Sequence, residues 1–156
     1  MEILTQIRWK SQVIPNYTGL VEIPAGAIDP YENVFEAIKR EVREECGLTV
    51  TKFINSQEYP LQKSRENNTA FAFQPFICQQ SISTLDGLPW VGFVFLCEVE
   101  GELKMEMREA KDPKWLSLEE LTDLVENHPE QVFSLQLPVL KYYLDWVKLS
   151  DFLLNV

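Results

Sequence analysis

The sequence predicts an α+β fold: an α/β/α sandwich in which a mixed β-sheet lies between helices. Across the 156 residues, short runs rich in β-branched and aromatic residues alternate with longer runs of helical periodicity. Some neighbouring strand-like runs are close enough along the chain to pair as hairpins. Such interleaving is typical of a sheet with helices on both faces. We expect one domain over 1–156, because the length suits one and the chain shows no repeat or linker.

Two strands and the strongest helix of the chain are expected in its N-terminal third. They are strands at 3–9 and 20–23, separated by a turn at 15–19, and a helix at 33–46. The helix has clear ends: Asn33 is a good N-cap residue with Glu36 three positions later, and Gly47 is a natural stop.

The remaining elements are three strands and two helices. We expect the strands at 50–56, 69–79 and 90–99, a polar stretch at 62–68, and the helices at 117–127 and 137–149. The second and third of these strands are aromatic and β-branched, which suits buried strands. Ser117 with Glu120 three positions later marks the start of the first helix, and the last helix has an amphipathic pattern.

Composition excludes several classes of protein. A net charge of −10 without a basic cluster disfavours nucleic acid and anionic membranes as partners. No apolar run approaches the length of a membrane span, and the N-terminus lacks the apolar core of a secretory signal. Three cysteines without a CxxC pair indicate reduced thiols, so we expect a cytoplasmic protein. The single histidine, His128, rules out a three-histidine zinc site and is expected to have no functional role.

One segment, residues 26–48, has a pattern with chemical meaning: Gly, five residues, Glu, seven residues, then Arg-Glu-apolar-any-Glu-Glu-any-Gly-apolar. On a helical wheel, Glu45 falls between the apolar residues Val34 and Ile38, and Glu41 falls beside Val34. An unpaired buried carboxylate is costly, so acids within an apolar stripe indicate a cation at this place.

The acids of this helix suggest which cation binds. Glu44 is expected near Glu41 and Glu45, where three carboxylates repel one another unless a cation is bound, and such hard oxygen ligands suit Mg²⁺ or Mn²⁺. Arg40, one turn before Glu44, is expected to hold that carboxylate, bidentately if the geometry allows. Glu32 is expected to contact Arg40 or a metal-bound water. The alternative is an ordinary solvated helix face with a surface ion pair, and the inward acids argue against it.

This run resembles the signature of the Nudix hydrolases. The resemblance implies the α/β/α sandwich and a reaction in which water attacks a pyrophosphate bridge with the help of divalent ions. It implies catalytic roles for Glu44 and Arg40, and a further acid from a loop after the central strands, for which Glu109 is the first choice and Asp112 the reserve. The alternative for either is a solvated acidic residue. The metal ligands it implies are the carbonyl of Ala25 and the carboxylates of Glu41, Glu44 and Glu45.

The residues just before the helix bear on the substrate. Residues 22–29 read E-I-P-A-G-A-I-D, which resembles the run that opens this motif in ADP-ribose and nucleoside-diphosphate-sugar pyrophosphatases. A small-molecule nucleotide such as ADP-ribose or a nucleotide sugar is therefore the expected substrate. Two alternatives remain open: a (d)NTP pyrophosphohydrolase of the nucleotide-pool sanitising kind, and a non-catalytic nucleotide-sensing domain.

Several aromatic residues are candidates for contacts with a base or a partner. Those expected to stack on a base, with core packing as the alternative, are Trp9, Tyr17 and Trp90. Tyr142, Tyr143 and Trp146 cannot all face one core stripe of the last helix. They either combine packing with exposure or contribute to a homodimer contact.

Overall fold

The computed structural model describes residues 2–9, 15–59, 62–65, 68–85, 89–104 and 110–154. In the N-terminal half the elements are β1 (Glu2–Arg8), η1 (Pro15–Tyr17), β2 (Val21–Glu22), α1 (Val34–Cys46), β3 (Thr49–Ile54), β4 (Gln57–Glu58), β5 (Gln62–Arg65), β6 (Asn68–Ala70) and β7 (Phe73–Gln74). In the C-terminal half they are β8 (Ile77–Ser81), β9 (Trp90–Val94), β10 (Leu96–Glu100), β11 (Ala110–Ser117), α2 (Leu118–Asn127), η2 (Pro129–Gln131) and α3 (Leu137–Leu154).

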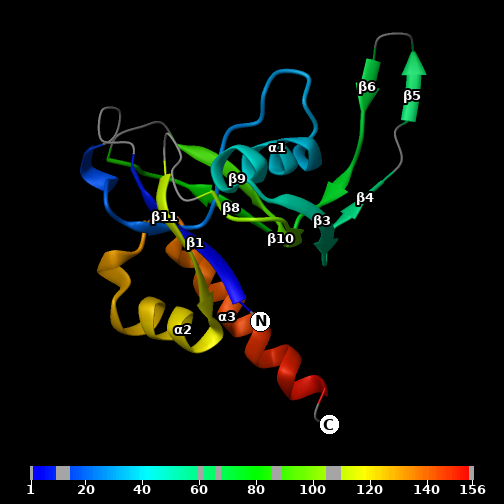
Figure 1. Ribbon diagram of the computed structural model, residues 1–156. Helices are drawn as coiled ribbons and strands as arrows, with labels where there is room; N and C mark the ends of the chain where they lie inside the picture. The colour runs from blue at the N-terminus through cyan, green and yellow to red at the C-terminus, as the bar shows by residue number, and fades with distance from the viewer. Residues whose placement is uncertain are drawn as a thin grey trace.

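The helices lie on two sides of the strands, as expected for an α+β sandwich. Figure 1 shows α1 on one side of β8, β9 and β10, and α2 and α3 on the other side of the molecule. Helix α1 contacts β3, whereas α2 packs against β11, β1 and α3. In the described part of the chain, no helix combines the length and apolarity that a bilayer-spanning helix requires.

The strands form several short ladders. The largest has the order β11-β1-β2, and four pairs accompany it: β10-β3, β4-β7, β5-β6 and β8-β9. These ladders are all antiparallel, and an isolated parallel bridge joins Val21 to Val132.

Both long strands expected from the sequence are divided in the structure. The run 69–79 is divided among β6, β7 and β8, and Pro75, which has no N–H for a ladder, lies between the last two. The run 90–99 changes partner at Phe95: Val94 pairs with Ile77 of β8, and Leu96 pairs with Ile54 of β3. This change of partner links two ladders that would otherwise be separate.

Strand β11 forms in a region where the sequence analysis expected a loop, and prolines in strands are found mainly at edges or bulges. Pro113 lies in this strand, which is at the edge of its ladder. The pairing with β1 shifts register between Thr5 and Ile7, opposite Asp112, whose φ is +48°. This bulge lets the strand accommodate Pro113 without losing its pairing on either side.

The ends of α1 and α2 agree with the sequence. The Asn33 side chain accepts hydrogen bonds from the backbone N–H groups of Phe35 and Glu36, and Gly47 ends α1 at φ +75°. Ser117 and Glu120 form the reciprocal capping box of α2. Helix α3 extends beyond its expected end, to Leu154.

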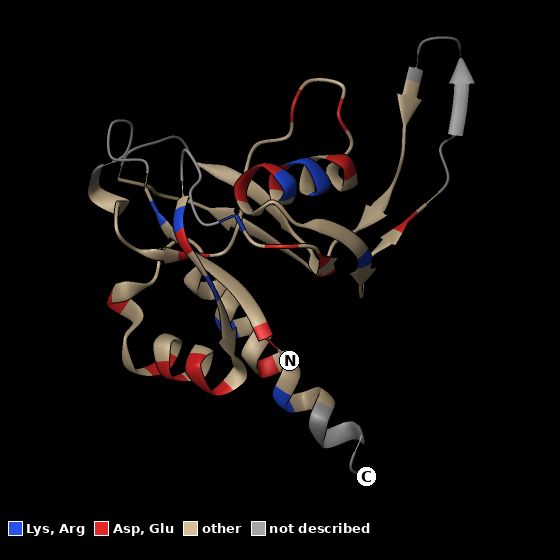
Figure 2. Cartoon of the chain, in the orientation of Figure 1, with Lys and Arg blue, Asp and Glu red and all other residues tan. Residues whose placement is uncertain are grey.

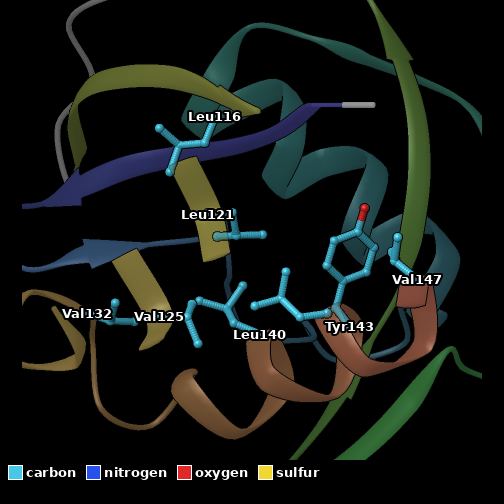
Figure 3. Packing of buried hydrophobic residues seen from close by; sticks show 8 residues of the cluster. Leu116, Leu121, Val125, Val132, Leu140, Tyr143 and Val147 are labelled. Carbon is cyan, nitrogen blue, oxygen red and sulfur yellow. The ribbon is translucent and has the colours of Figure 1, made fainter. Parts of the chain in front are cut away.

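Two apolar clusters hold the helices in place. The larger lies among β11, α2 and α3, and Figure 3 shows seven of its labelled members pointing toward one another: Leu116, Leu121, Val125, Val132, Leu140, Tyr143 and Val147. A second, aromatic cluster lies beneath α1, where Phe35 packs at ring-centroid distances of 4.9 Å from Phe53 and 5.2 Å from Phe95. Because Phe35 is in the first turn of α1, these contacts anchor the start of that helix.

The aromatic residues of α3 divide between core and surface, as the sequence predicted. Tyr143 is 4% exposed, Tyr142 is 44% exposed, and Trp146 is partly buried. All three pack against one ring, that of Phe76, at centroid distances of 5.3 to 6.5 Å.

Candidate active site

Arg40 is the centre of an ion-pair cluster on α1. Its Nε and Nη2 donate to the two carboxylate oxygens of Glu32 at 2.9 and 2.8 Å, and its Nη1 donates to Glu41 at 2.6 Å. Nη2 also donates to the Ala27 carbonyl at 2.8 Å. The guanidinium therefore joins the helix to the loop that precedes it.

These contacts change the ionisation of both partners. Hydrogen bonds from Arg40, with a backbone hydrogen bond from Asp29, lower the pKa of Glu32 from 4.5 to about 2. Hydrogen bonds to Glu32 and Glu41 raise the pKa of Arg40 above its ordinary value. Glu32 and Arg40 are therefore both fully ionised at neutral pH.

Of the two contacts expected for Arg40, the one with Glu32 is confirmed, and the one with Glu44 is a single long contact. The bidentate partner of Arg40 is Glu32, and its Nη1 lies 3.5 Å from a Glu44 oxygen. The Glu44 side chain is 63% exposed, so water competes for it. Glu32 faces the guanidinium from the preceding loop, which leaves Glu44 directed toward solvent.

Glu41 lies directly against the backbone of Gly26. A Cβ atom at Gly26 would overlap the Glu41 carboxylate, so only glycine allows this approach. The Glu41 side chain is 15% exposed. The sequence prediction that this acid lies at the edge of the buried face is confirmed.

Glu45 points into the protein, as the helical wheel predicted. It is 9% exposed, and its Oε2 accepts hydrogen bonds from the Gln6 side chain and the Ala25 backbone N–H, both at 3.0 Å. The short Ala25–Gly26 segment thus contacts Glu45 through one residue and Glu41 through the next.

The three acids of the helix do not converge on one point. Within the described ranges, no group of three or more His, Cys, Asp or Glu side chains is close enough to hold a metal ion. Each acid has different contacts. Glu41 contacts Arg40 and Gly26, Glu45 contacts Gln6 and Ala25, and Glu44 is directed toward solvent. The assignment of all three acids as metal ligands stays a prediction.

The donors nevertheless fit a hard divalent cation. They are carboxylate oxygens beside a backbone turn, which is the ligand chemistry of Mg²⁺ and Mn²⁺. The absence of a side chain at Gly26 lets the Glu41 carboxylate reach the turn, so an ion bound by Glu41 would lie beside this backbone.

A second buried acid, Glu22, was not anticipated as part of this region. It is 3% exposed and accepts a 2.6 Å hydrogen bond from Arg8. The Gln6 amide lies between Glu22 and Glu45, at 3.4 and 3.0 Å. The sequence did contain a signal for Glu22 as part of this region. It is an acid in an otherwise apolar strand, just before the Pro-Ala-Gly run.

An open cleft of about 630 Å³ lies along the polar face of α1. Figure 2 shows both acidic and basic residues along this helix. The lining includes Glu32, Arg40 and Glu44 from the ion-pair region, together with the cations Lys39 and Arg43. Positive and negative groups therefore face the same space.

The aromatic residues expected to bind a base differ in their accessibility. Trp9 is 41% exposed, and Lys111 Nζ lies 3.5 Å from its ring centroid. Trp90 is 38% exposed, and its ring covers Gly92. Tyr17 is instead a core residue: it is 6% exposed, packs edge-on against Phe133, and its hydroxyl accepts a hydrogen bond from the Leu85 backbone. Its burial favours the packing alternative.

The additional acid has two candidates, and Glu109 lies outside the described residues. Asp112 is exposed and occupies the β11 bulge, opposite Gln6 of β1. The bulge therefore places Asp112 opposite Gln6, the β1 residue whose side chain donates to Glu45.

Cysteine and histidine chemistry has little support here. Burial raises the pKa of the Cys46 and Cys97 thiols to about 12, so both remain protonated at neutral pH. His128 is 48% exposed at the C-terminal end of α2, 3.8 Å from Asp123 and from Glu130.

The comparisons with known proteins agree with this fold. The model of the NUDIX domain family matches residues 2–135, and the chain belongs to this family. It is 30% identical over 119 residues to Nudix hydrolase 6 of Arabidopsis thaliana, covering 74% of this chain and 35% of that protein. It is 25% identical over 117 residues to the NAD-capped RNA hydrolase NUDT12 of Homo sapiens, covering 74% and 20%. The chain thus spans well under half the length of these curated relatives.

Solved structures of the family share the fold. A NUDIX family hydrolase from Clostridium perfringens superposes with a TM-score of 0.59 at 21% identity, covering 94% of this chain and 89% of that one. The MutT NUDIX hydrolase from Burkholderia pseudomallei gives 0.55 at 22% identity, covering 76% and 75%. At these identities the likeness establishes the fold alone.

Proposed function

We propose that this protein hydrolyses the pyrophosphate bond of a nucleoside diphosphate linked to another group, using Mg²⁺ or Mn²⁺. The observation that supports this most strongly is the position of the Ala25–Gly26 segment. Its Ala25 N–H donates to Glu45, and its Gly26 backbone touches the Glu41 carboxylate. Two acids of the motif and a backbone turn thereby lie in contact with one another.

Each motif residue has a role in this proposal. Arg40 fixes the loop and Glu41 in relation to each other, which orients the site before substrate arrives. Glu44, which lines the cleft, takes part in catalysis, and Glu109 supplies a further acid. The proposed metal ligands are the Ala25 carbonyl and the carboxylates of Glu41, Glu44 and Glu45. A divalent ion bound there would lower the pKa of a bound water and neutralise phosphate charge.

The proposed substrate is ADP-ribose or a nucleotide sugar. Residues 22–29 resemble the corresponding run of ADP-ribose pyrophosphatases. Lys39 and Arg43 provide positive charge in the cleft, where a substrate phosphate would lie. Trp9 and Trp90 are exposed enough to stack on a base. The relative named as an NAD-capped RNA hydrolase adds NAD-type dinucleotides to the substrates worth testing, while the net charge of −10 favours a small molecule over a long polyanion.

A substrate panel tests this function. Purified protein is incubated with ADP-ribose, nucleotide sugars, NAD, dinucleoside polyphosphates and (d)NTPs, with Mg²⁺, Mn²⁺ or EDTA, and the products are identified by mass spectrometry. Formation of AMP and ribose phosphate from ADP-ribose, lost with EDTA, is the expected result. Turnover of (d)NTPs alone would indicate the sanitising alternative. If no compound is cleaved but a nucleotide raises the melting temperature, a sensing domain replaces the enzyme.

Three further properties belong to the same proposal. Residues 1–156 act as one Nudix domain, and the free cysteines Cys46, Cys78 and Cys97 suit a reducing, cytoplasmic location. A homodimer is supported by apolar side chains on β9: Val91 is 58% exposed and Phe93 37% exposed. Light scattering after gel filtration would show a mass of one chain if the dimer proposal is wrong.

A further inference from the structure

Gln6 is among the least accessible side chains of the described residues although it is polar. It lies in the middle of β1 and is 2% exposed. Its Nε2 donates to Glu45 Oε2 at 3.0 Å and approaches Glu22 Oε1 at 3.4 Å. On the other side of the amide, Oε1 accepts from the Cys46 thiol at 3.8 Å.

This arrangement permits only one orientation of the amide. Ionised carboxylates accept hydrogen bonds and cannot donate them, so the NH₂ group must face Glu22 and Glu45. The thiol, the donor on the remaining side, faces the amide oxygen. An NH₂ group has two hydrogens, so it can donate one hydrogen bond to each carboxylate. Gln6 therefore joins β1, β2 and α1 at a point where two buried acids meet.

Each acid also has partners of its own. Glu22 accepts a hydrogen bond from the positively charged Arg8 at 2.6 Å, which fixes it as the counter-ion of that arginine. Glu45 accepts two neutral N–H groups on one oxygen, from Gln6 and from Ala25. Because both donors act on Oε2, they set the direction of the Glu45 carboxylate relative to the Ala25–Gly26 segment.

We propose that Gln6 is a positioning residue that holds Glu45 in the orientation needed to bind the divalent ion and keeps it apart from Glu22. This inference rests on the proposed function, in which Glu45 is a metal ligand. Partners that orient a metal ligand typically affect metal affinity by about 10- to 100-fold when they are removed. Gln6 should therefore influence metal binding without contacting the metal or the substrate.

The test measures the affinity of the protein for Mn²⁺ alone, by electron paramagnetic resonance of free Mn²⁺, in wild type and Gln6→Met. Methionine retains the length and volume of the side chain and removes its donor. The matched control is Thr5→Val on the same strand. Thr5 is 3% exposed and donates to the Lys114 carbonyl at 3.1 Å, so this variant also removes a buried hydrogen bond, but outside the acidic network.

We expect Gln6→Met to weaken Mn²⁺ binding by about tenfold or more, and Thr5→Val to leave it unchanged. With a substrate identified by the panel, Gln6→Met should lower kcat more than it changes KM. If Gln6→Met does not fold, Gln6→Asn serves instead, since its shorter amide cannot reach both acids and should weaken Mn²⁺ binding in the same direction.

The outcomes separate this inference from the proposed function. If wild type binds Mn²⁺ and hydrolyses a substrate while the Gln6 variants bind Mn²⁺ as wild type does, Gln6 has no positioning role and the proposed function stands. Equal losses in Gln6→Met and Thr5→Val would also overturn the inference, because the effect would then be general destabilisation. A wild type that neither binds Mn²⁺ nor hydrolyses any substrate would overturn both.

Discussion

The backbone of Gly26 lies against the carboxylate of Glu41, with no room for a side chain between them. Gly26→Ala should therefore move Glu41 away from the turn and from Arg40. Displacement of a catalytic group by an ångström can cost about 100-fold in rate, so we expect kcat to fall by about 10- to 100-fold. Stability should fall by only about 1 kcal/mol, because the end of the Glu41 side chain can rotate and one hydrogen bond is lost. Steady-state kinetics and urea unfolding measure the two effects.

Gly19→Ala is the matched control for this variant. Gly19 has open space around its Cα but a φ of +90°, so alanine is strained there without touching the site. It should lower stability and leave kcat unchanged. Equal kcat values for wild type and Gly26→Ala would contradict the role given to the contact.

Replacement of Arg40 by lysine should destabilise the fold although the charge remains. Lysine cannot reproduce the paired hydrogen bonds to Glu32 or reach Glu41 and Ala27 at the same time. We expect a loss of about 1–2 kcal/mol in the free energy of unfolding, as for hydrogen bonds to charged groups. Arg43→Lys, an exposed position on the same helix, should change it by less than about 0.5 kcal/mol. Similar losses in both variants would show that the Arg40 contacts contribute nothing specific.

Stability should decrease in acid through Glu32. Its pKa is lowered from 4.5 to about 2 in the folded protein, so the folded state favours the ionised form. The resulting stabilisation is fully present above pH 4.5 and is lost as the pH falls toward 2. Glu120, whose pKa is also lowered to about 2 by its capping contacts and Lys114, contributes in the same range.

Glu32→Gln and Glu120→Gln should each reduce this acid sensitivity, because a neutral side chain no longer takes up the proton. Thermal melts from pH 6 to pH 2 provide the measurement. Melting curves for Glu32→Gln that depend on pH as steeply as those of wild type would show that the Glu32 contact is not linked to folding.

Glu44→Gln and Glu45→Gln should both lose turnover but differ in stability. The Glu44 side chain is 63% exposed, so its change should cost less than about 0.5 kcal/mol. Glu45 is buried and accepts two N–H groups, so losing its charge should cost about 1–2 kcal/mol. Glu119→Gln, an exposed position on α2, is the control for a charge change alone. Near-normal kcat in both site variants would refute the site.

The three thiols should react at very different rates. Cys78 is exposed, whereas Cys46 is buried and Cys97 partly buried, and desolvation raises the pKa of both of these thiols to about 12. Since the thiolate is the reactive form, a disulfide reagent at pH 8 should modify Cys78 quickly and the other two only after unfolding. A Cys78→Ser variant should lose the fast phase. A fast phase that persists in this variant would indicate that Cys46 or Cys97 is accessible.

Local features could be predicted from the sequence because their determinants lie within a few residues. Asn33 and Gly47 determine the ends of α1 through their own side chain or backbone freedom. Helical periodicity alone placed Glu45 on the buried face. The same locality made Glu44 look like the partner of Arg40, since it is one turn away on the helix.

Contacts between distant segments were decided only by the tertiary structure. Glu32 and Glu44 were both expected near Arg40, and Glu32 receives the paired hydrogen bonds because the loop before α1 folds back onto the helix. Strand β11 forms despite Pro113 because it lies at an edge and bulges beside β1. Gln6 reaches Glu22 and Glu45 because β1 lies beside both β2 and α1.

The sequence by itself therefore determined the family motif, the helix that carries it and the acids available for chemistry, because each follows from residue identity and short spacing. The folded chain decided which of those acids are held, by which partners and in which direction. Hydrogen bonds to Glu45 come from positions 39 and 20 residues away along the chain, and no periodicity encodes such separations.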